Sequence, residues 1–257
     1  MTATTQQRDS QNTSGKKVAV LLPCYNEEVT IGKVVGDFRN ALPFASVYVF
    51  DNNSSDQTAG NAAKAGAIVV YSPRRGKGNV VKHMFREVDA DIYVMADGDD
   101  TYPADMAGTL IEALEESGVD MVVGTRLAHH DKKAFRAFHG FGNTLISKLI
   151  SLLFSSSLTD VLSGYRVFSR HFARTLYLTA GGFEVETEMT LQALVKNCFI
   201  KEIPVRYSSR PEGSESKLNT FSDGLMICKG MFLIFKDYRP FVFFSALSIS
   251  CFLLGLV

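Results

Sequence analysis

Four aspartates crowd into nine positions of the stretch M-A-D-G-D-D-T-Y-P-A-D, residues 95–105, directly after an apolar run. Carboxylates this close repel one another unless something neutralises them. Asp97 and Asp99 stand two apart around a glycine that lets the backbone turn tightly, and such a pair suits a hard divalent cation that also accepts phosphate oxygens. The alternative is a capped turn without metal, which is the role we expect for Asp100 and Asp105 beside the next helix.

Two further charged motifs have residue types that could serve a site. The segment R-R-G-K-G at 74–78 is glycine-rich and precedes an expected helix, which favours anion binding. We therefore place Lys77 near a bound anion, with a plain exposed turn as the alternative. The acids Glu184, Glu186 and Glu188 in F-E-V-E-T-E open another expected helix, where they favour its N-terminal dipole.

Apolar runs alternate with helical spacing through the middle of the chain. This alternation predicts right-handed crossovers and an α/β fold with a mostly parallel, doubly wound sheet. Such sheets bind ligands beyond the carboxyl ends of their strands, so P-C-Y-N-E-E, D-N-N-S-S-D and D-G-D-D should carry the function. Asn26 and Ser54 are expected to begin the first two helices. The expected strands are 17–23, 47–50, 67–71, 91–96 and 119–124, and the expected helices are 26–38, 54–65, 77–89 and 103–117.

Composition excludes several classes of function. The 257 residues carry no net charge, which argues against a nucleic-acid-binding protein. The four cysteines are widely spaced, with no C-x-x-C pair, so they indicate reduced thiols in the cytosol instead of a zinc site or a disulfide framework.

The two ends of the chain differ from its middle. Residues 1–16 are polar and predict a disordered lead, followed by a catalytic domain at 17–208. Apolar residues recur at helical spacing within 220–239, which predicts an interfacial amphipathic helix, although a helix packed on the core has the same pattern. Residues 240–257 are almost wholly apolar after Pro240 and lack charge, and we expect a transmembrane helix that this sequence truncates, with a buried core helix as the alternative.

Taken together, the motifs resemble glycosyltransferase family 2, and within it the branch of dolichyl-phosphate mannose synthases and polyprenyl-phosphate glycosyltransferases. The resemblance runs from about Lys17 to Arg239 with the motifs in the family's order. It implies a GT-A fold, a nucleotide-sugar donor, Mg or Mn, and inversion at the sugar carbon. The motifs that carry it are P-C-Y-N-E-E, D-N-N-S-S-D-Q-T, D-G-D-D-T-Y-P, V-V-G-T-R, D-V-L-S-G-Y-R-V-F-S-R and R-P-E-G-S-E-S-K-L.

The resemblance also implies roles for single residues at the donor. Asp97 and Asp99 match a metal-binding D-x-D, with Thr101 where the family often has another polar side chain that completes the set. Residues 209–219 match a mobile loop that closes over the donor diphosphate. The implied donor-binding positions are Pro23, Tyr25, Glu27, Asp51, Asn52, Lys77, Ala96, Gly98, Arg126, Arg210 and Lys217.

The implied acceptor, a polyprenyl phosphate, is already ionised near neutral pH and needs no general base. It needs cations that hold it in line for attack, and Arg136 and Arg126, at the ends of the basic segment 126–136, are the candidates. Asp160 has two readings. It is the base if the acceptor is a hydroxyl, whereas with a phosphate acceptor it orients Arg166 or the acceptor.

The resulting hypothesis is an enzyme that moves one hexose or N-acetylhexosamine from a nucleoside-diphosphate sugar to a polyprenyl phosphate. It would be membrane-associated, with its catalytic domain in the cytoplasm. The sequence leaves open the sugar, uridine or guanosine in the donor, dolichyl or undecaprenyl in the acceptor, and a homo-oligomer. The alternatives are transfer to a sugar hydroxyl and a non-catalytic scaffold. The absence of tryptophan excludes the Q-x-x-R-W motif of processive relatives.

Overall fold

The computed structural model describes most of the chain, with gaps near its ends and in one loop. Arg136, Lys217 and most of the helix expected at 220–239 lie outside the described residues, as does most of the N-terminal lead. For residues 127–145 only the backbone is considered. The described residues are 15–130, 137–154, 156–214, 225, 229–230, 232–233, 235–237 and 239–255.

In the described part of the chain, one seven-stranded sheet runs in the order β3-β2-β1-β4-β6-β5-β7. All neighbouring strands are parallel except β6, which is antiparallel to both β4 and β5. The mostly parallel α/β fold expected from the sequence is therefore confirmed. The strands are β1 Val18–Cys24, β2 Ser46–Asp51, β3 Ile68–Tyr71, β4 Ile92–Met95, β5 Met121–His130, β6 Arg166–Ser169 and β7 Ile200–Tyr207.

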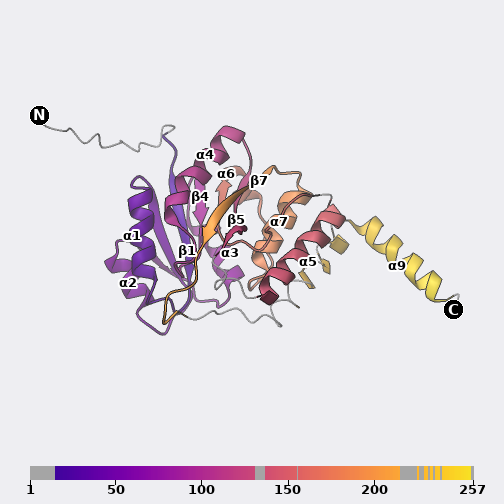
Figure 1. Ribbon diagram of the computed structural model, residues 1–257, viewed down its shortest axis with the longest axis horizontal. Coiled ribbons are helices and arrows are strands. Elements are labelled where there is room, and N and C mark those ends of the chain that lie inside the picture. The colour runs from indigo at the N-terminus through magenta and orange to yellow at the C-terminus, as the bar shows by residue number, and fades with distance from the viewer. Residues whose placement is uncertain are drawn as a thin grey trace, which may run out of the picture.

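Helices cover both faces of this sheet, with α1 and α2 at one end and α5 and α9 at the other (Figure 1). Three helices begin within four residues of their expected starts: α3 begins at the expected residue, and α2 and α4 each begin four residues later. The helices are α1 Ile31–Ala41, α2 Thr58–Lys64, α3 Lys77–Glu87, α4 Ala107–Ser117, α5 Ala137–Phe154, α6 Arg170–Thr175, α7 Val185–Val195 and α9 Pro240–Leu254, with a short 3-10 helix η1 at Ala104–Met106.

Alternate residues of the central strand β1 point into two separate apolar cores. Val20 and Leu22 pack with α1 and α4 in one core, whereas Ala19 and Leu21 pack with α3, α6 and α7 in the other. A strand buried on both faces reads as a continuous apolar run, which is the pattern of 17–23. The two cores hold the sheet rigid, so the loops at the carboxyl ends of its strands have a fixed base.

The two residues expected to begin the first two helices, Asn26 and Ser54, lie outside them. Asn26 has a left-handed backbone, with a φ of 52°, and α1 begins five residues later at Ile31. Ser54 does not cap α2, because its Oγ accepts a hydrogen bond from Asn26 N at 3.0 Å. Both residues instead join the loops after β1 and β2, and this contact ties two loops of the same sheet edge together.

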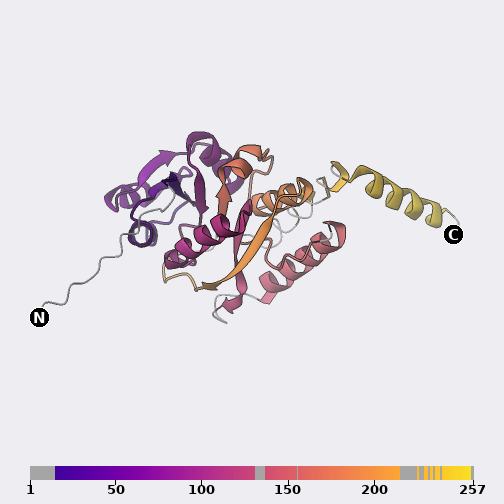
Figure 2. The same ribbon diagram turned by 90° about the horizontal axis from the view of Figure 1, so that it is seen from above.

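The last helix, α9, extends away from the body of the molecule in both perpendicular views (Figures 1 and 2). It has 15 residues, and its apolar side chains, including Phe241 and Leu254, are exposed. Among the described residues, no helix combines the length and apolarity that crossing a membrane requires. The transmembrane segment expected at 240–257 is thus not confirmed.

Candidate active site

Asp97 and Asp99 follow β4, and each carboxylate is paired with a cation from a distant segment. Lys77 Nζ lies 2.5 Å from Asp97 Oδ1, and Arg210 Nη2 lies 2.5 Å from Asp99 Oδ2. Burial raises the pKa of the Asp99 carboxyl, and the charge of Asp97 raises it further. The two cations therefore supply the neutralisation that the crowded aspartates require.

The tight turn at this motif does not depend on Gly98 in the expected way. The left-handed residue of the turn is Asp100, with a φ of 61°. Gly98 is needed for space, because a Cβ there would overlap Cys24 Sγ on β1. Asp100 pairs with Lys33 at 2.7 Å and Asp105 with Arg206 at 2.6 Å, so both lie in structural ion pairs beside the site.

Thr101 is positioned to hold Asp99. Its Oγ1 donates a hydrogen bond to Asp99 Oδ1 at 2.6 Å, and its N donates to the same oxygen at 3.2 Å. A hydroxyl that donates to a metal-binding carboxylate fixes the orientation of that ligand. Ala96, one position before Asp97, is fully buried at the end of β4 and contributes to the apolar core.

The second part of the segment 74–78 is packed against another loop, whereas Arg74 and Arg75 are exposed. Gly78 N donates to Gly182 O at 3.0 Å. A Cβ on Gly76 would overlap the Gly181 carbonyl, and one on Gly78 would overlap the Ala180 carbonyl. The close approach of these two backbones places the Lys77 side chain inside the site, where it is 11% exposed.

The three acids of F-E-V-E-T-E have different roles, and the sequence did not separate them. Glu188 accepts hydrogen bonds from Thr179 N and Ala180 N, and Glu184 accepts from the next two backbone N–H groups, so both fix the loop that packs against 74–78. Glu186 instead reaches the site, with Oε1 2.6 Å from Lys77 Nζ. Periodicity alone assigned all three acids to the helix N-terminus, and only the fold singles out Glu186.

Arg210 joins the D-x-D motif to the loop after β1. Its Nη1 lies 3.1 Å from Glu27 Oε1, while its Nη2 contacts Asp99. Ser214 Oγ donates to the other Glu27 oxygen at 3.1 Å. These contacts join the segment after β7 to the loops after β1 and β4. The closure of residues 209–219 over a donor, which the resemblance implies, stays a prediction.

The two residues at the end of β2 differ sharply in their surroundings. Asp51 is 6% exposed, and its Oδ1 is buried without a hydrogen-bond partner among the described residues. The Asn52 amide, by contrast, donates to Ser72 O and Arg74 O and accepts from Gly76 N. Asn52 therefore braces the backbone of the loop that carries Lys77, whereas Asp51 has an oxygen available to a ligand.

Pro23 is the second-last residue of β1 and Tyr25 directly follows this strand, so both lie at the carboxyl edge of the sheet. The guanidinium of Arg75 lies over the Tyr25 ring, 5.1 Å from its centroid. Pro23 is half-buried in β1, next to β2. An aromatic ring and a flat cation in the loops after β1 and β3 are suited to contact a nucleobase.

Asp160 is paired with Arg126, and the expected pairing with Arg166 is absent from the described contacts. Asp160 accepts from Arg126 N and Nε at 2.9 Å and from Nη2 at 2.7 Å. Arg166 instead donates to the Ser163 and Val161 carbonyls and to Thr190 Oγ1, and burial lowers its pKa to about 10.

The sequence did not single out the Tyr207–Tyr102 pair beside Arg126 or the close approach of Gly164 to Asp97. Arg126 lies 5.6 Å over the Tyr207 ring, which packs edge-on against Tyr102. Tyr102 Oη accepts from Gly164 N at 3.0 Å, and a Cβ on Gly164 would come within 2.7 Å of Asp97 Oδ2. Tyr102 and Gly164 belong to the motif segments T-Y-P and S-G-Y-R. Their contact with each other depends on the antiparallel strand β6.

Comparisons with known proteins match most of this chain. The model of glycosyl transferase family 2 matches residues 19–176. The glycosyltransferase AglJ of Haloferax volcanii is 34% identical over 240 residues, which cover 93% of this chain and 78% of that protein. The dolichyl-phosphate hexose transferase of the same organism is 27% identical over 222 residues, covering 86% of this chain and 95% of that protein.

A solved structure confirms the fold. Glucosyl-3-phosphoglycerate synthase of Mycobacterium tuberculosis, crystallised with Mn²⁺, uridine diphosphate and phosphoglyceric acid, superposes with a TM-score of 0.72. The match covers 86% of this chain and 79% of that one at 22% identity, so it shows a shared GT-A-like α/β fold. Since the family model spans most of the sheet and a 34% identical relative is matched over most of its length, this chain is a glycosyltransferase of family 2.

Proposed function

We propose that this enzyme transfers a single sugar from a nucleoside-diphosphate sugar to a polyprenyl phosphate, using Mg²⁺ or Mn²⁺ at the cytoplasmic face of a membrane. One observation carries the proposal. Lys77 pairs with Asp97 and Arg210 with Asp99 at the carboxyl edge of the sheet, and Arg126, which pairs with Asp160, supplies a third cation. Such a site matches a diphosphate with its metal and a second phosphate as nucleophile.

The two aspartates fit a divalent cation that takes part of its coordination from the donor. No group of three His, Cys, Asp or Glu side chains that could hold a metal occurs among the described residues. Mg²⁺ is commonly held by one or two carboxylates together with substrate phosphates and waters, which is the donor set available at Asp97 and Asp99. The metal would supply positive charge to the leaving nucleoside diphosphate.

The chain's own cations would perform the remaining electrostatic work. Lys77 and Arg210 already contact the two aspartates, so both are within reach of a diphosphate bound there. Positive groups fixed around the departing phosphates stabilise their growing charge without transferring a proton. Asp51 Oδ1 would accept a hydrogen bond from the donor nucleobase, since a buried carboxylate oxygen without a partner among the described residues needs a donor.

Arg126 would hold the acceptor phosphate. Asp160 fixes its guanidinium through Nε and Nη2, and the side chain is 15% exposed. Because a phosphate acceptor is already ionised, this arrangement needs no general base, and both Asp160 oxygens are occupied by Arg126. The named activity of the dolichyl-phosphate hexose transferase supports an acceptor of this type.

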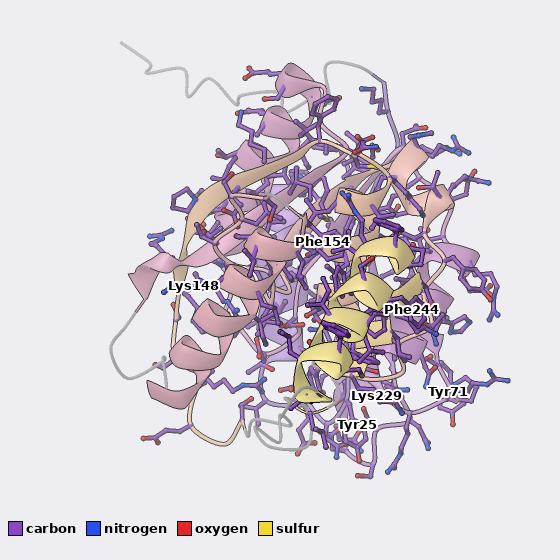
Figure 3. The ribbon with its side chains drawn as sticks, turned by 90° about the vertical axis from the view of Figure 1, so that its right-hand side faces the viewer. Tyr25, Tyr71, Lys148, Phe154, Lys229 and Phe244 are labelled. Carbon is purple, nitrogen blue, oxygen red and sulfur yellow. The ribbon has the colours of Figure 1, made fainter. Side chains whose placement is uncertain are left out.

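A lipid acceptor agrees with the apolar surface at one end of the molecule. Phe154 at the end of α5 packs against Phe235, which packs against Phe243 of α9. Figure 3 shows α5 and α9 on the same side of the molecule, with Phe154 and Phe244 labelled. Exposed residues on both helices, including Leu152 at 79% and Phe241 at 84%, would contact the bilayer that holds the acceptor.

The test is a panel of nucleotide sugars with Mg²⁺ or Mn²⁺, with and without a polyprenyl phosphate. We expect one donor to release its nucleotide only when the lipid is present, together with a lipid-linked sugar. Nucleotide release that ignores the lipid but responds to a sugar hydroxyl would contradict the proposal.

A further inference from the structure

Lys77 is shared between two acids, only one of which belongs to the D-x-D motif. Its Nζ lies 2.5 Å from Asp97 Oδ1 and 2.6 Å from Glu186 Oε1. The Lys77 side chain is 11% exposed, and that of Glu186 is 4% exposed. A cation held between two acids can leave one of them and remain neutralised by the other. Lys77 could therefore leave Asp97 without its ammonium becoming an unpaired buried charge.

Glu186 has a second carboxylate oxygen with which it could bind the Lys77 ammonium. Its Oε2 is buried and has no hydrogen-bond partner in the described part of the chain. Burial disfavours the charged form of this carboxyl, and the nearby Lys77 opposes that effect. The Phe183 ring lies 5.7 Å from Lys77 Nζ and adds a second favourable surface for the cation on the side of α7.

The surroundings hold this pair in place from both sides. Asn52 braces the loop before Lys77, and Gly76 and Gly78 allow that loop to pack against 180–182. Glu184 and Glu188 hold the opposing loop by its backbone. Two of the three acids of α7 thus fix the position from which the third meets Lys77.

Asp99 has an equivalent arrangement. Arg210 is shared between Asp99 and Glu27, at 2.5 Å and 3.1 Å. Each carboxylate of the D-x-D motif therefore carries an internal cation, and each cation also contacts an acid outside the motif. The same arrangement, a cation shared between a D-x-D aspartate and a glutamate, therefore occurs at both aspartates.

We propose that Lys77 occupies Asp97 until a divalent cation binds, and that Glu186 then retains the Lys77 ammonium beside the donor diphosphate. Glu186 is a positioning residue that acts through Lys77. The proposal rests on the metal site of the proposed function. A divalent cation at Asp97 repels the neighbouring ammonium, and Glu186 removes the cost of leaving that ammonium unpaired in a buried site.

The experiment measures Mn²⁺ affinity of the donor-free protein from the electron paramagnetic resonance signal of free Mn²⁺. We expect Glu186→Gln to weaken binding about tenfold, because Lys77 then has one acid left and stays on Asp97. The double variant Lys77→Met/Glu186→Gln removes the competing cation and its second partner together, without changing net charge. We expect this variant to bind Mn²⁺ about tenfold more tightly than the unaltered protein.

Because the two variants should change Mn²⁺ affinity in opposite directions, the measurement separates a positioning role of Glu186 from a structural one. If Glu186 only supported the fold, both variants would lose affinity, which would overturn the proposal. An unchanged affinity of the double variant, or its failure to bind Mn²⁺ at all, would overturn it as well. If Glu186→Gln does not fold, as judged by circular dichroism, the double variant decides, because its two buried groups are both neutral.

Two controls distinguish this proposal from the metal site on which it rests. Glu112→Gln removes a carboxylate from the exposed face of α4 and should leave Mn²⁺ affinity unchanged. Asp97→Asn/Asp99→Asn should abolish binding. If this variant binds Mn²⁺ as the unaltered protein does, the metal site itself is wrong. If Asp97→Asn/Asp99→Asn does not bind Mn²⁺ and Lys77→Met/Glu186→Gln gains no affinity, the metal site stands and only the transfer of Lys77 from Asp97 to Glu186 is wrong.

Discussion

At the residue scale, Asp160 and Arg126 form the ion pair to which we assign the acceptor phosphate. The three hydrogen bonds from Arg126 use both Asp160 oxygens, which leaves this acid poorly placed to accept a proton from a substrate. Although burial lowers the pKa of the Arg126 guanidinium, the neighbouring Tyr102 and Asp160 outweigh it and hold the pKa above its usual value. Arg126 is therefore a permanent cation beside the site.

We predict that Asp160→Asn raises the KM for the acceptor at least about tenfold and changes kcat much less. The reason is that Arg126 loses the acid that orients it, while no proton transfer is affected. Breaking one side of a buried ion pair should also lower the free energy of unfolding by about 3 kcal/mol. Steady-state kinetics and denaturant unfolding measure the two effects. A fall in kcat of about 10²–10⁴ with little change in KM would instead indicate a general base.

Sequence predicted the residues whose types are chemically distinctive. Asp97 and Asp99 were found because two carboxylates at the end of a buried strand have few structural explanations, and the structure pairs both with cations. Glu186 was missed because an acid in the first turn of a helix is ordinarily explained by the helix dipole. Its contact with Lys77 spans more than a hundred positions of the chain and depends on tertiary packing.

At the element scale, the site depends on two loops that approach each other closely. The loop 74–78 before α3 and the loop 179–182 before α7 touch backbone to backbone. Two glycines make the approach possible, and the acids of α7 hold its other side. The position of Lys77 is consequently set by main-chain packing, which is stiffer than packing between flexible side chains.

We predict that Gly78→Ala destabilises the protein by about 1–3 kcal/mol and raises the KM for the donor, because the added Cβ forces the two backbones apart. Gly32→Ala is the matched control: this glycine also lies in a helix, but a Cβ there meets open space. The control should gain up to about 1 kcal/mol from helix propensity and keep its donor KM. Thermal unfolding and donor kinetics compare the pair. Equal stability changes in the two variants would show that the close approach is unimportant.

The strand pattern and the mostly parallel sheet were predictable, but the reversed direction of β6 was not. Runs such as 92–96 are apolar throughout because both faces of the sheet are covered, and this marks them as central strands. The sequence R-V-F-S of β6 gives no sign that it runs antiparallel between β4 and β5. That reversal brings Gly164 against Asp97 and could only be seen in the folded chain.

At the scale of the whole molecule, the charged site and the exposed apolar helix α9 lie in different parts of the molecule. The acids and cations of the site gather at the carboxyl edge of the sheet, while α9 extends from the end that also carries α5 (Figure 1). A lipid with a charged head and an apolar chain would have to contact both regions. The sequence indicated this division through its apolar C-terminal segment, but it did not predict the contact of Phe154 with Phe235.

We predict that Phe241→Ser/Phe244→Ser lowers partitioning onto vesicles of phosphatidylcholine and phosphatidylglycerol at least about tenfold, since each aromatic ring gains about 1.5–3 kcal/mol from burial. Co-sedimentation measures the effect. Tyr177→Ser removes an aromatic side chain that is 77% exposed on the domain itself and should leave partitioning unchanged. An equal loss in both variants would exclude α9 as the contacting element.

In the proposed reaction, a phosphate oxygen of a lipid attacks the donor without a general base. The experiment that tests this first compares a polyprenyl phosphate with the corresponding polyprenol, using a radiolabelled nucleotide sugar, Mn²⁺ and the unaltered protein. We expect a lipid-linked sugar from the phosphate, none from the alcohol, and none from either with Asp97→Asn/Asp99→Asn. Transfer to the alcohol or to a sugar hydroxyl at a comparable rate, or full activity of the double variant, would contradict the proposed reaction.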